Sequence, residues 1–194
     1  MPFNYKTKPY KHQEEALLRS FNRKNYAYFM EMGCGKSKVL IDNITWLYQE
    51  KEIDTAIIIA PKGVYMNWKN AEIPTHLPDN VENNVYVWKA SANKTEKKVL
   101  EEGVKTRDKL RILLVNVEAF ATAKVIKYLE AFIHRSNFML AVDESTTIKN
   151  IKAKRTKSVL RLGESAKYKR ILTGSPITQS PMDLYSQCYF LDKE

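Results

Sequence analysis

The sequence predicts an α/β fold in which a doubly wound, mainly parallel sheet carries helices on both faces. Three observations support this prediction. Short apolar and β-branched runs recur along the 194-residue chain, and helical patterns separate them. The runs are continuous, whereas a strand with one exposed face would alternate apolar and polar residues. A glycine loop follows the first run directly, as expected where a strand turns into a helix.

The expected strands are the apolar runs themselves, each of a length that suits a buried strand. In chain order they are residues 26–30, 56–60, 85–88, 112–115, 138–142 and 169–172. The helical patterns between and after them are residues 36–50, 64–71, 94–103, 118–135, 153–162 and 181–191. Residues 74–84 are rich in Pro, Asn and Asp, so we expect an exposed, mobile loop there. The chain length fits one domain, and no internal boundary or repeat is visible.

Cysteine usage and hydropathy exclude several classes of protein. Cys34 and Cys188 lie far apart in the sequence, which argues against a disulfide framework and against a Cys-x-x-Cys metal site. No apolar run approaches the length of about 18 residues that a membrane span needs, and the first residues lack the apolar centre of a secretion signal. We therefore expect an intracellular location and no membrane partner.

The charge of the chain points to a polyanionic partner. The net charge is +10 and the pI is near 9.4. Clustered lysines and arginines gain free energy when they release counterions from nucleic acid. A lysine-rich surface that serves only solubility has the same composition, so the charge alone leaves both interpretations open.

Residues 30–37, here called the glycine loop, have the composition of a phosphate-binding loop. Gly33 and Gly35 let backbone N–H groups turn towards phosphate oxygens, Lys36 can reach the terminal phosphates, and the Ser37 hydroxyl can ligate Mg²⁺. The stricter pattern has a glycine where this chain has Met30. A plain strand-to-helix turn would explain the glycines but not the order of Lys and Ser. The loop therefore predicts ATP or GTP binding.

Asp143 and Glu144 follow the fifth apolar run, where ligands gather in parallel sheets. An Asp there can hold the Mg²⁺ that bridges two phosphates, and the next Glu can deprotonate the attacking water. The alternative is an acidic cap for the following helix. The catalytic interpretation is favoured because the glycine loop lies upstream on a separate strand. The two segments are expected to meet at one edge of the sheet.

Five ordered segments carry a resemblance to a known family. They are residues 8–13 for adenine recognition, 32–37 for motif I, 59–62 with Trp68 for motif Ia, 143–150 for motif II, and 172–177 with 184–186 for motif III. Together they resemble the superfamily 2 helicase-like ATPases, most closely the Swi/Snf-type double-stranded DNA translocases. The resemblance spans nearly the whole chain and implies a RecA-like fold.

The resemblance implies a role for each matching residue. The nucleotide-binding residues would be Gln13, Gly33, Cys34, Gly35, Lys36 and Ser37, with Gln13 reading the adenine. Ser37 and Asp143 would hold Mg²⁺, while Lys36 and Glu144 would be the catalytic residues. Thr173, Gly174 and Ser175 would couple hydrolysis to movement, although without the resemblance they are simply a turn before Pro176.

The resemblance also implies contacts with DNA phosphates. The residues concerned are Pro61, Lys62, Asn116 and Lys149. A basic stretch over residues 149–157 adds to them, and a solvated helix face explains that stretch equally well. Phosphate contacts position a duplex without reading its bases, so little sequence specificity is expected.

Two departures from the family pattern stand out. Ser145-Thr146 replaces the usual Ala-His or Gly-His after the Asp-Glu pair, which makes the details of coupling differ. Cys34 replaces a larger apolar residue in the glycine loop, at a position that contributes mainly backbone. The hydrolytic residues themselves match the pattern.

The function implied by the resemblance is that of an ATPase that uses ATP hydrolysis to move along double-stranded DNA. Residues 1–194 would be the first RecA-like lobe, with ATP and Mg²⁺ in a cleft completed by arginines of a second lobe that this chain lacks. The isolated chain is then expected to be nearly inactive. A strand-separating DNA or RNA helicase lobe remains an alternative. So does a standalone nucleotide-dependent module that binds DNA or a protein without turnover.

Overall fold

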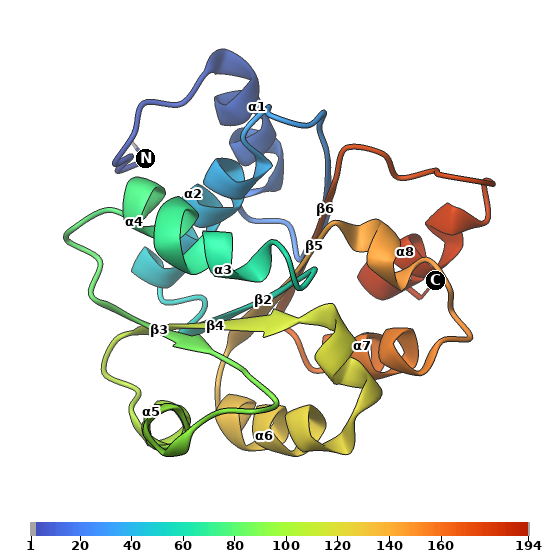
Figure 1. The fold of residues 1–194 in the computed structure, drawn as a ribbon. Helices are drawn as coiled ribbons and strands as arrows, with labels where there is room; N and C mark the ends of the chain where they lie inside the picture. Colours follow the sequence, from blue (N-terminus) through green and yellow to red (C-terminus); the bar gives the residue numbers. More distant parts are fainter. Residues whose placement is uncertain (1–2, 194) are drawn as a thin grey trace.

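The computed structural model describes residues 3–193 and has a parallel sheet at its centre (Figure 1). The sheet has six strands in the order β1-β6-β5-β2-β4-β3. The strands are β1 (Asn25–Phe29), β2 (Thr55–Ala60), β3 (Asn83–Val87), β4 (Leu110–Asn116), β5 (Phe138–Asp143) and β6 (Tyr168–Thr173). Each overlaps one of the expected apolar runs, with boundaries moved by at most two residues. The α/β fold class is therefore confirmed.

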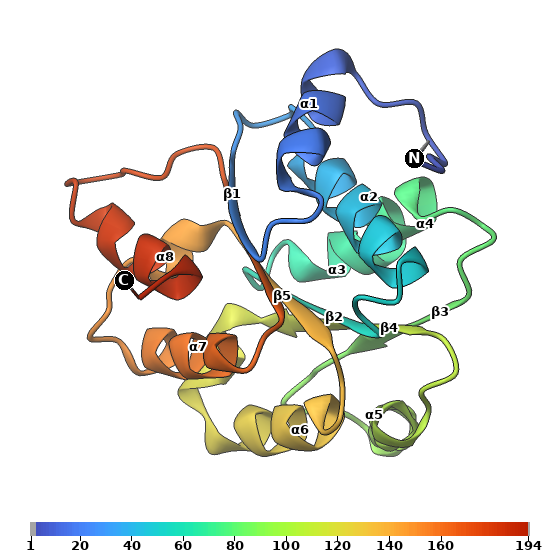
Figure 2. The ribbon, with the colours of Figure 1, turned by 180° about the vertical axis from the view of Figure 1, so that it is seen from behind.

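Helices cover both faces of the sheet (Figures 1 and 2). One face carries α1 (Lys11–Ser20), α2 (Lys36–Gln49), α3 (Tyr65–Asn67) and α4 (Ile73–His76). The other carries α5 (Lys94–Lys105), α6 (Ala123–Ile133), α7 (Lys154–Glu164) and α8 (Asp183–Leu191). Within residues 3–193, no helix combines the length and the hydropathy needed to cross a bilayer.

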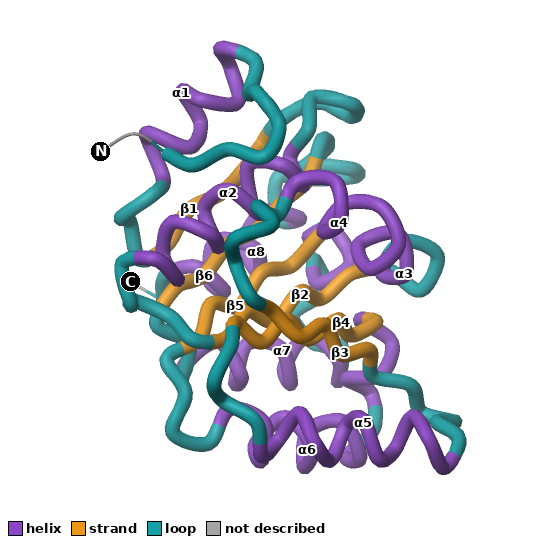
Figure 3. The backbone as a smooth tube through the Cα atoms, turned by 90° about the vertical axis from the view of Figure 1, so that its left-hand side faces the viewer, coloured by secondary structure: helices purple, strands orange, loops and turns teal. Residues whose placement is uncertain are grey.

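The continuous apolar strands follow from this two-sided cover. All residues of β2 are buried, and successive side chains enter opposite cores: Ile58 lies in the core under α2, and Ile57 and Ile59 lie in the core under α6. Figure 3 shows these two layers of helices above and below the strands. A strand buried on both faces gains nothing from polar residues, which is why the alternating pattern is missing.

Three helical regions differ from the sequence expectation. Helix α1 was given no range in advance. The long helix expected over residues 118–135 is divided into a 3₁₀ turn (Val117–Ala121) and α6, because the Asn116 carboxamide accepts from the Ala119 N–H at 2.8 Å and closes a separate turn. The helix expected over 64–71 is α3 followed by a π-helical turn, Trp68–Glu72.

The expectation of an exposed loop over residues 74–84 is largely wrong. Helix α4 covers its start, β3 takes up its end, and Leu77 and Val81 are only 4% exposed in between. The N-terminal segment also ties this region down, since Asn4 donates to the Asn80 carboxamide at 3.1 Å. The polar composition was misleading because the two apolar residues, spaced four apart, pack into the core.

Candidate active site

Three candidate segments leave neighbouring strands at the carboxyl edge of the sheet. Phe29, at the end of β1, is paired in register with Thr173 at the end of β6. Asp143, at the end of β5, is paired with Leu172. The glycine loop, the turn at residues 173–176 (the coupling turn) and the turn at residues 143–148 (the acidic turn) therefore start side by side. The structure thus brings together segments that lie more than 100 residues apart in the chain.

The glycine loop has the backbone that its glycines allow. Gly33 and Gly35 have φ values of 78° and 77°, in the left-handed region that other residues avoid. Gly35 also lacks room for a side chain, because a Cβ there would lie 2.3 Å from Gln13 Nε2. The loop wraps around the Lys36 ammonium, which donates to the carbonyl oxygens of Met30 and Glu31 at 3.1 Å each. Lys36 and Ser37 then begin α2, whose positive N-terminal end points to the loop.

The start of α1 clamps the glycine loop from the other side. Gln13 Nε2 donates to the Cys34 carbonyl at 3.1 Å, and its Oε1 accepts from the Tyr10 N–H at 3.0 Å. Both the nitrogen and the oxygen of this amide are thus bonded to backbone atoms. Gln13 would have to give up these hydrogen bonds to form new ones with an adenine. The His12 ring lies 3.0 Å from the same Cys34 carbonyl. This contact of His12 could not be predicted, because a contact with a backbone oxygen 22 residues away leaves no signal in the sequence.

Asp143 is held in one orientation by two donors. The indole N–H of Trp68 donates to Oδ2 at 2.9 Å, and the Glu144 N–H donates to Oδ1 at 3.0 Å. Burial raises the pKa of Asp143 above its usual value, while the Trp68 bond and the positive charge of Lys36 oppose that rise. The motif that contains Trp68 gave no indication of this role for its side chain.

Glu144 has an unusual backbone conformation. Its φ of 48° and ψ of 60° are left-handed, a region that few non-glycine residues occupy. Glu144 precedes the 3₁₀ turn Ser145–Ile148 but makes no side-chain bond to cap it. Asp143 bonds only the N–H of the next residue within this turn. The capping alternative is therefore not supported.

The coupling turn packs against the glycine loop. The Thr173 hydroxyl accepts from the Ser175 N–H at 3.1 Å, which closes the turn. At Gly174, a Cβ would lie 3.2 Å from the Met32 nitrogen and 3.4 Å from the Met30 oxygen. A side chain at this position would press on the backbone of the glycine loop itself.

The four candidate DNA-binding residues lie at the same edge of the sheet, but only some of their side chains are free of intramolecular contacts. Pro61 and Lys62 directly follow β2, and Lys62 is exposed. Asn116 ends β4, and its side-chain oxygen is occupied by the Ala119 N–H. The Lys149 ammonium donates to the Thr178 hydroxyl at 2.5 Å and lies 3.6 Å from the Asp183 carboxylate. The Asn116 and Lys149 side chains therefore already make intramolecular contacts.

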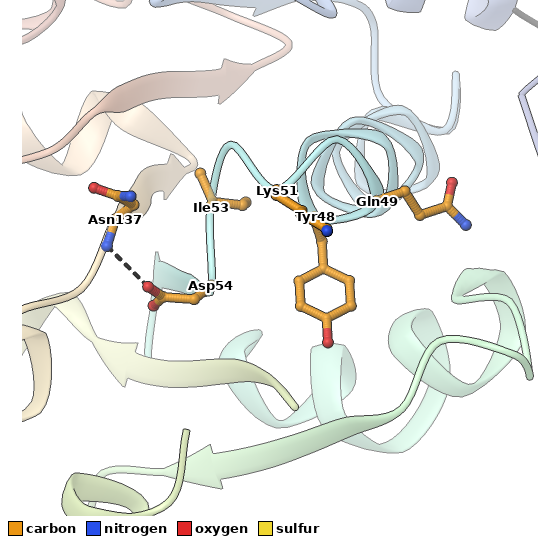
Figure 4. Close-up of a pocket in the computed structure, with 6 residues that line it drawn as sticks. All are labelled: Tyr48, Gln49, Lys51, Ile53, Asp54 and Asn137. Atoms are coloured by element: carbon orange, nitrogen blue, oxygen red, sulfur yellow. Dashed lines mark hydrogen bonds between the residues drawn. The ribbon is translucent and has the colours of Figure 1, made fainter. Parts of the chain in front are cut away.

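A cavity of about 390 Å³ lies at the opposite edge of the sheet (Figure 4). Ile53 and Asp54, just before β2, and Asn137, just before β5, form part of its wall. The Asp54 carboxylate there accepts from the Asn137 N–H at 3.0 Å and lies 3.6 Å from Arg111. No candidate residue lines this cavity.

Comparison with known proteins identifies relatives of the whole fold. A family model described as SNF2-related domain matches residues 17–194. The probable ATP-dependent DNA helicase CHR12 of Arabidopsis thaliana is 29% identical over 83% of this chain and 14% of its own length. Helicase SWR1 of Mycosarcoma maydis is 26% identical over 83% of this chain and 8% of its own. The chain thus spans 8% to 14% of the length of these relatives.

Two solved structures share the architecture. The Sulfolobus solfataricus SWI2/SNF2 ATPase core in complex with dsDNA aligns with a TM-score of 0.76 and 23% identity. The alignment covers 99% of this chain and 37% of that one. A Sulfolobus solfataricus SWI2/SNF2 ATPase core domain aligns with a TM-score of 0.70 and 24% identity, over 99% of this chain and 36% of that one. These likenesses establish the fold.

Proposed function

Because this chain belongs to the SNF2-related domain family, we propose that it is the ATP-binding first lobe of a nucleic-acid-dependent ATPase, and specifically of a double-stranded DNA translocase. The observation that carries the proposal is the common sheet edge from which the glycine loop with Lys36 and the acidic turn with Asp143 both leave the strands. A triphosphate with its metal ion fits between two such segments.

The residues present fit a magnesium ion that the nucleotide helps to bind. Within residues 3–193, no three His, Cys, Asp or Glu side chains are grouped to hold a metal by themselves. Mg²⁺ is usually bound by one or two protein ligands together with phosphate and water oxygens. Ser37 and the oriented carboxylate of Asp143 would be those ligands. When bound, the ion neutralises charge on the phosphates.

The remaining roles follow from position. Lys36 would exchange its bonds to the Met30 and Glu31 carbonyls for bonds to the terminal phosphates. Glu144, directly after Asp143, would accept the proton of the water that attacks the terminal phosphate. Gln13 contacts the glycine loop, and its carboxamide would bind the edge of the adenine ring of a nucleotide held there.

The net charge of +10 and the exposed Lys62 support nucleic acid as the partner. The similarity to a protein named as a probable DNA helicase favours DNA over RNA. We propose that a second lobe closes over the nucleotide and that the cycle of closing and opening moves the enzyme along a duplex.

The test is ATP hydrolysis, with and without duplex DNA, by this chain joined to its natural downstream sequence. We expect DNA to stimulate hydrolysis, Lys36→Ala to abolish nucleotide binding, and Glu144→Gln to retain binding but lower turnover at least about a hundredfold. Lys167→Ala is the matched control, because Lys167 pairs with Glu52 next to the opposite edge of the sheet.

Two outcomes would reject the assignments. An unchanged rate in Glu144→Gln would remove Glu144 as the base, and unchanged nucleotide binding in Lys36→Ala would remove the glycine loop as the phosphate site. Displacement of one strand of a forked duplex, rather than movement along an intact one, would identify a strand-separating helicase instead.

A further inference from the structure

We propose that Ser145 and Gln187 form a positioning pair that ties the acidic turn to the coupling turn. The inference rests on the proposed nucleotide site and assigns the residues that link its two halves. Ser145 directly follows Glu144, the proposed base, and Gln187 lies in α8. Neither residue was singled out as a site residue by the sequence.

The pair makes a continuous set of hydrogen bonds. Ser145 Oγ donates to Gln187 Oε1 at 2.6 Å. Gln187 Nε2 in turn donates to the Pro176 carbonyl at 2.8 Å and to the Asp183 carbonyl at 2.7 Å. Ser145 and Gln187 are both 0% exposed. Water therefore cannot replace a broken bond, and each member depends on the other for its partner.

The coupling turn extends this set of contacts to the glycine loop. Pro176 is two residues beyond Gly174, which packs on the backbone of Met30 and Met32 in the glycine loop. Contacts thus run from the acidic turn through Ser145 and Gln187 to the coupling turn, and from there to the glycine loop. A displacement of Ser145, the residue after Glu144, away from Pro176 would break a buried hydrogen bond of Gln187.

Neighbouring contacts make α8 and the acidic turn one unit. Ser186 Oγ donates to the Ile148 carbonyl at 2.5 Å. The Asp183 carboxylate accepts from the Thr178 and Gln179 N–H groups at 2.9 and 2.7 Å, which fixes the segment between the coupling turn and α8. The only side-chain link found from Ser145 within residues 3–193 is the one to Gln187.

The pair also accounts for a departure from the family pattern. In the family pattern that the sequence resembles, Ala or Gly stands at the position of Ser145, and neither of those side chains can donate a hydrogen bond. The hydroxyl and the facing carboxamide therefore provide this chain with a connection that an Ala or Gly at position 145 cannot make. Ser145 and Gln187 are positioning residues, since they act through Glu144 and the coupling turn.

Hydrogen exchange on this chain tests the proposal directly. The amides of Thr178 and Gln179 report on the segment, and they are measured alone and with Mg²⁺ and a non-hydrolysable ATP analogue. In Ser145→Ala we expect these amides to exchange about five- to tenfold faster in the nucleotide complex, the effect of one lost buried hydrogen bond. In Gln187→Met we expect an increase at least as large, because Gln187 makes three hydrogen bonds through its side chain. Affinity for the analogue should stay within about twofold, because neither residue touches it.

Three further variants sharpen the test. The double variant should exchange no faster than Gln187→Met alone, because Gln187→Met already removes the bond that Ser145→Ala breaks. Ser145→Cys keeps the volume with a weaker donor and should fall between Ala and the wild type. Ser20→Ala is the control, since this equally buried hydroxyl bonds Tyr28 at 2.7 Å in the other core.

The outcomes separate the two proposals. Unchanged exchange in Ser145→Ala, or additive effects in the double variant, would overturn the positioning pair even if the analogue binds normally. Failure of the unaltered chain to bind the analogue would instead reject the nucleotide site, and the coupling that depends on it.

Discussion

Asp143 is a carboxylate whose burial opposes the charge that its proposed role requires. It is 7% exposed, and burial raises its pKa. The indole N–H of Trp68 opposes this effect by bonding Oδ2, and it also leaves Oδ1 to the Glu144 N–H. The Trp68 donor therefore favours the ionised form and, together with the Glu144 N–H, fixes the direction of the carboxylate.

Trp68→Phe tests this role, because it keeps an aromatic ring and removes the N–H. We expect Mg²⁺-dependent binding of an ATP analogue to weaken by about tenfold, the effect of one lost hydrogen bond to a charged group. Binding of the analogue without Mg²⁺ should change much less. Titrations at several Mg²⁺ concentrations, followed by fluorescence of a labelled nucleotide, give both values.

Trp88→Phe is the matched control for this prediction. The Trp88 N–H is also buried, but it has no hydrogen-bond partner among residues 3–193. Its loss should leave the Mg²⁺ dependence unchanged. Equal effects of the two variants would show that Trp68 acts only by filling space.

Helix α2 carries a second buried carboxylate one turn after the glycine loop. Lys38 Nζ lies 2.6 Å from Asp42 Oδ2, and the two side chains are 5% and 4% exposed. Asp42 Oδ1 has no partner in the described part of the chain. Burial raises the pKa of Asp42 from 3.8 to about 6, although the Lys38 ammonium opposes the shift.

This pKa shift makes the free energy of unfolding depend on the ionisation of Asp42 in α2. The folded state holds a proton on Asp42 that the unfolded state releases, so the free energy of unfolding falls as pH rises between 3.8 and about 6. The loss amounts to at most about 3 kcal/mol over that window. Relative to the wild type, Asp42→Asn should therefore gain stability as pH rises from about 4 to about 7.

Urea denaturation of both proteins across this pH range measures the difference. Asp79→Asn serves as the control, because its ion pair with Lys6 is on the surface and Asp79 is 87% exposed. The difference between Asp79→Asn and the wild type should stay nearly flat. Parallel curves for Asp42→Asn and the wild type would show that Asp42 is ionised throughout.

At the scale of the whole molecule, the sheet could be predicted because burial on both faces leaves a continuous signal in each strand. The glycine loop and Asp143-Glu144 follow such strands, so their common edge was also predictable. The links between them were not. Trp68 meets Asp143 across 75 residues, and Ser145 meets Gln187 across 42. Nothing in a single sequence pairs residues at such distances, and polar composition likewise concealed the buried Leu77 and Val81.

The arrangement of charges predicts what the isolated chain can do. Lys36, Asp143 and Glu144 lie at the carboxyl edge of the sheet. The two fully buried arginines make their hydrogen bonds away from this edge. Arg111 donates to the Gly103 and Phe132 carbonyls, and Arg170 donates to the Asn43 side chain. An arginine directed at the terminal phosphate is worth about 10³ to 10⁵ in rate in related nucleotide hydrolases. We therefore expect the chain alone to bind ATP but to hydrolyse it slower by about that factor than the same chain joined to a second lobe. Single-turnover hydrolysis, with Lys36→Ala as the background, measures both rates, and comparable rates would show that the first lobe is complete by itself.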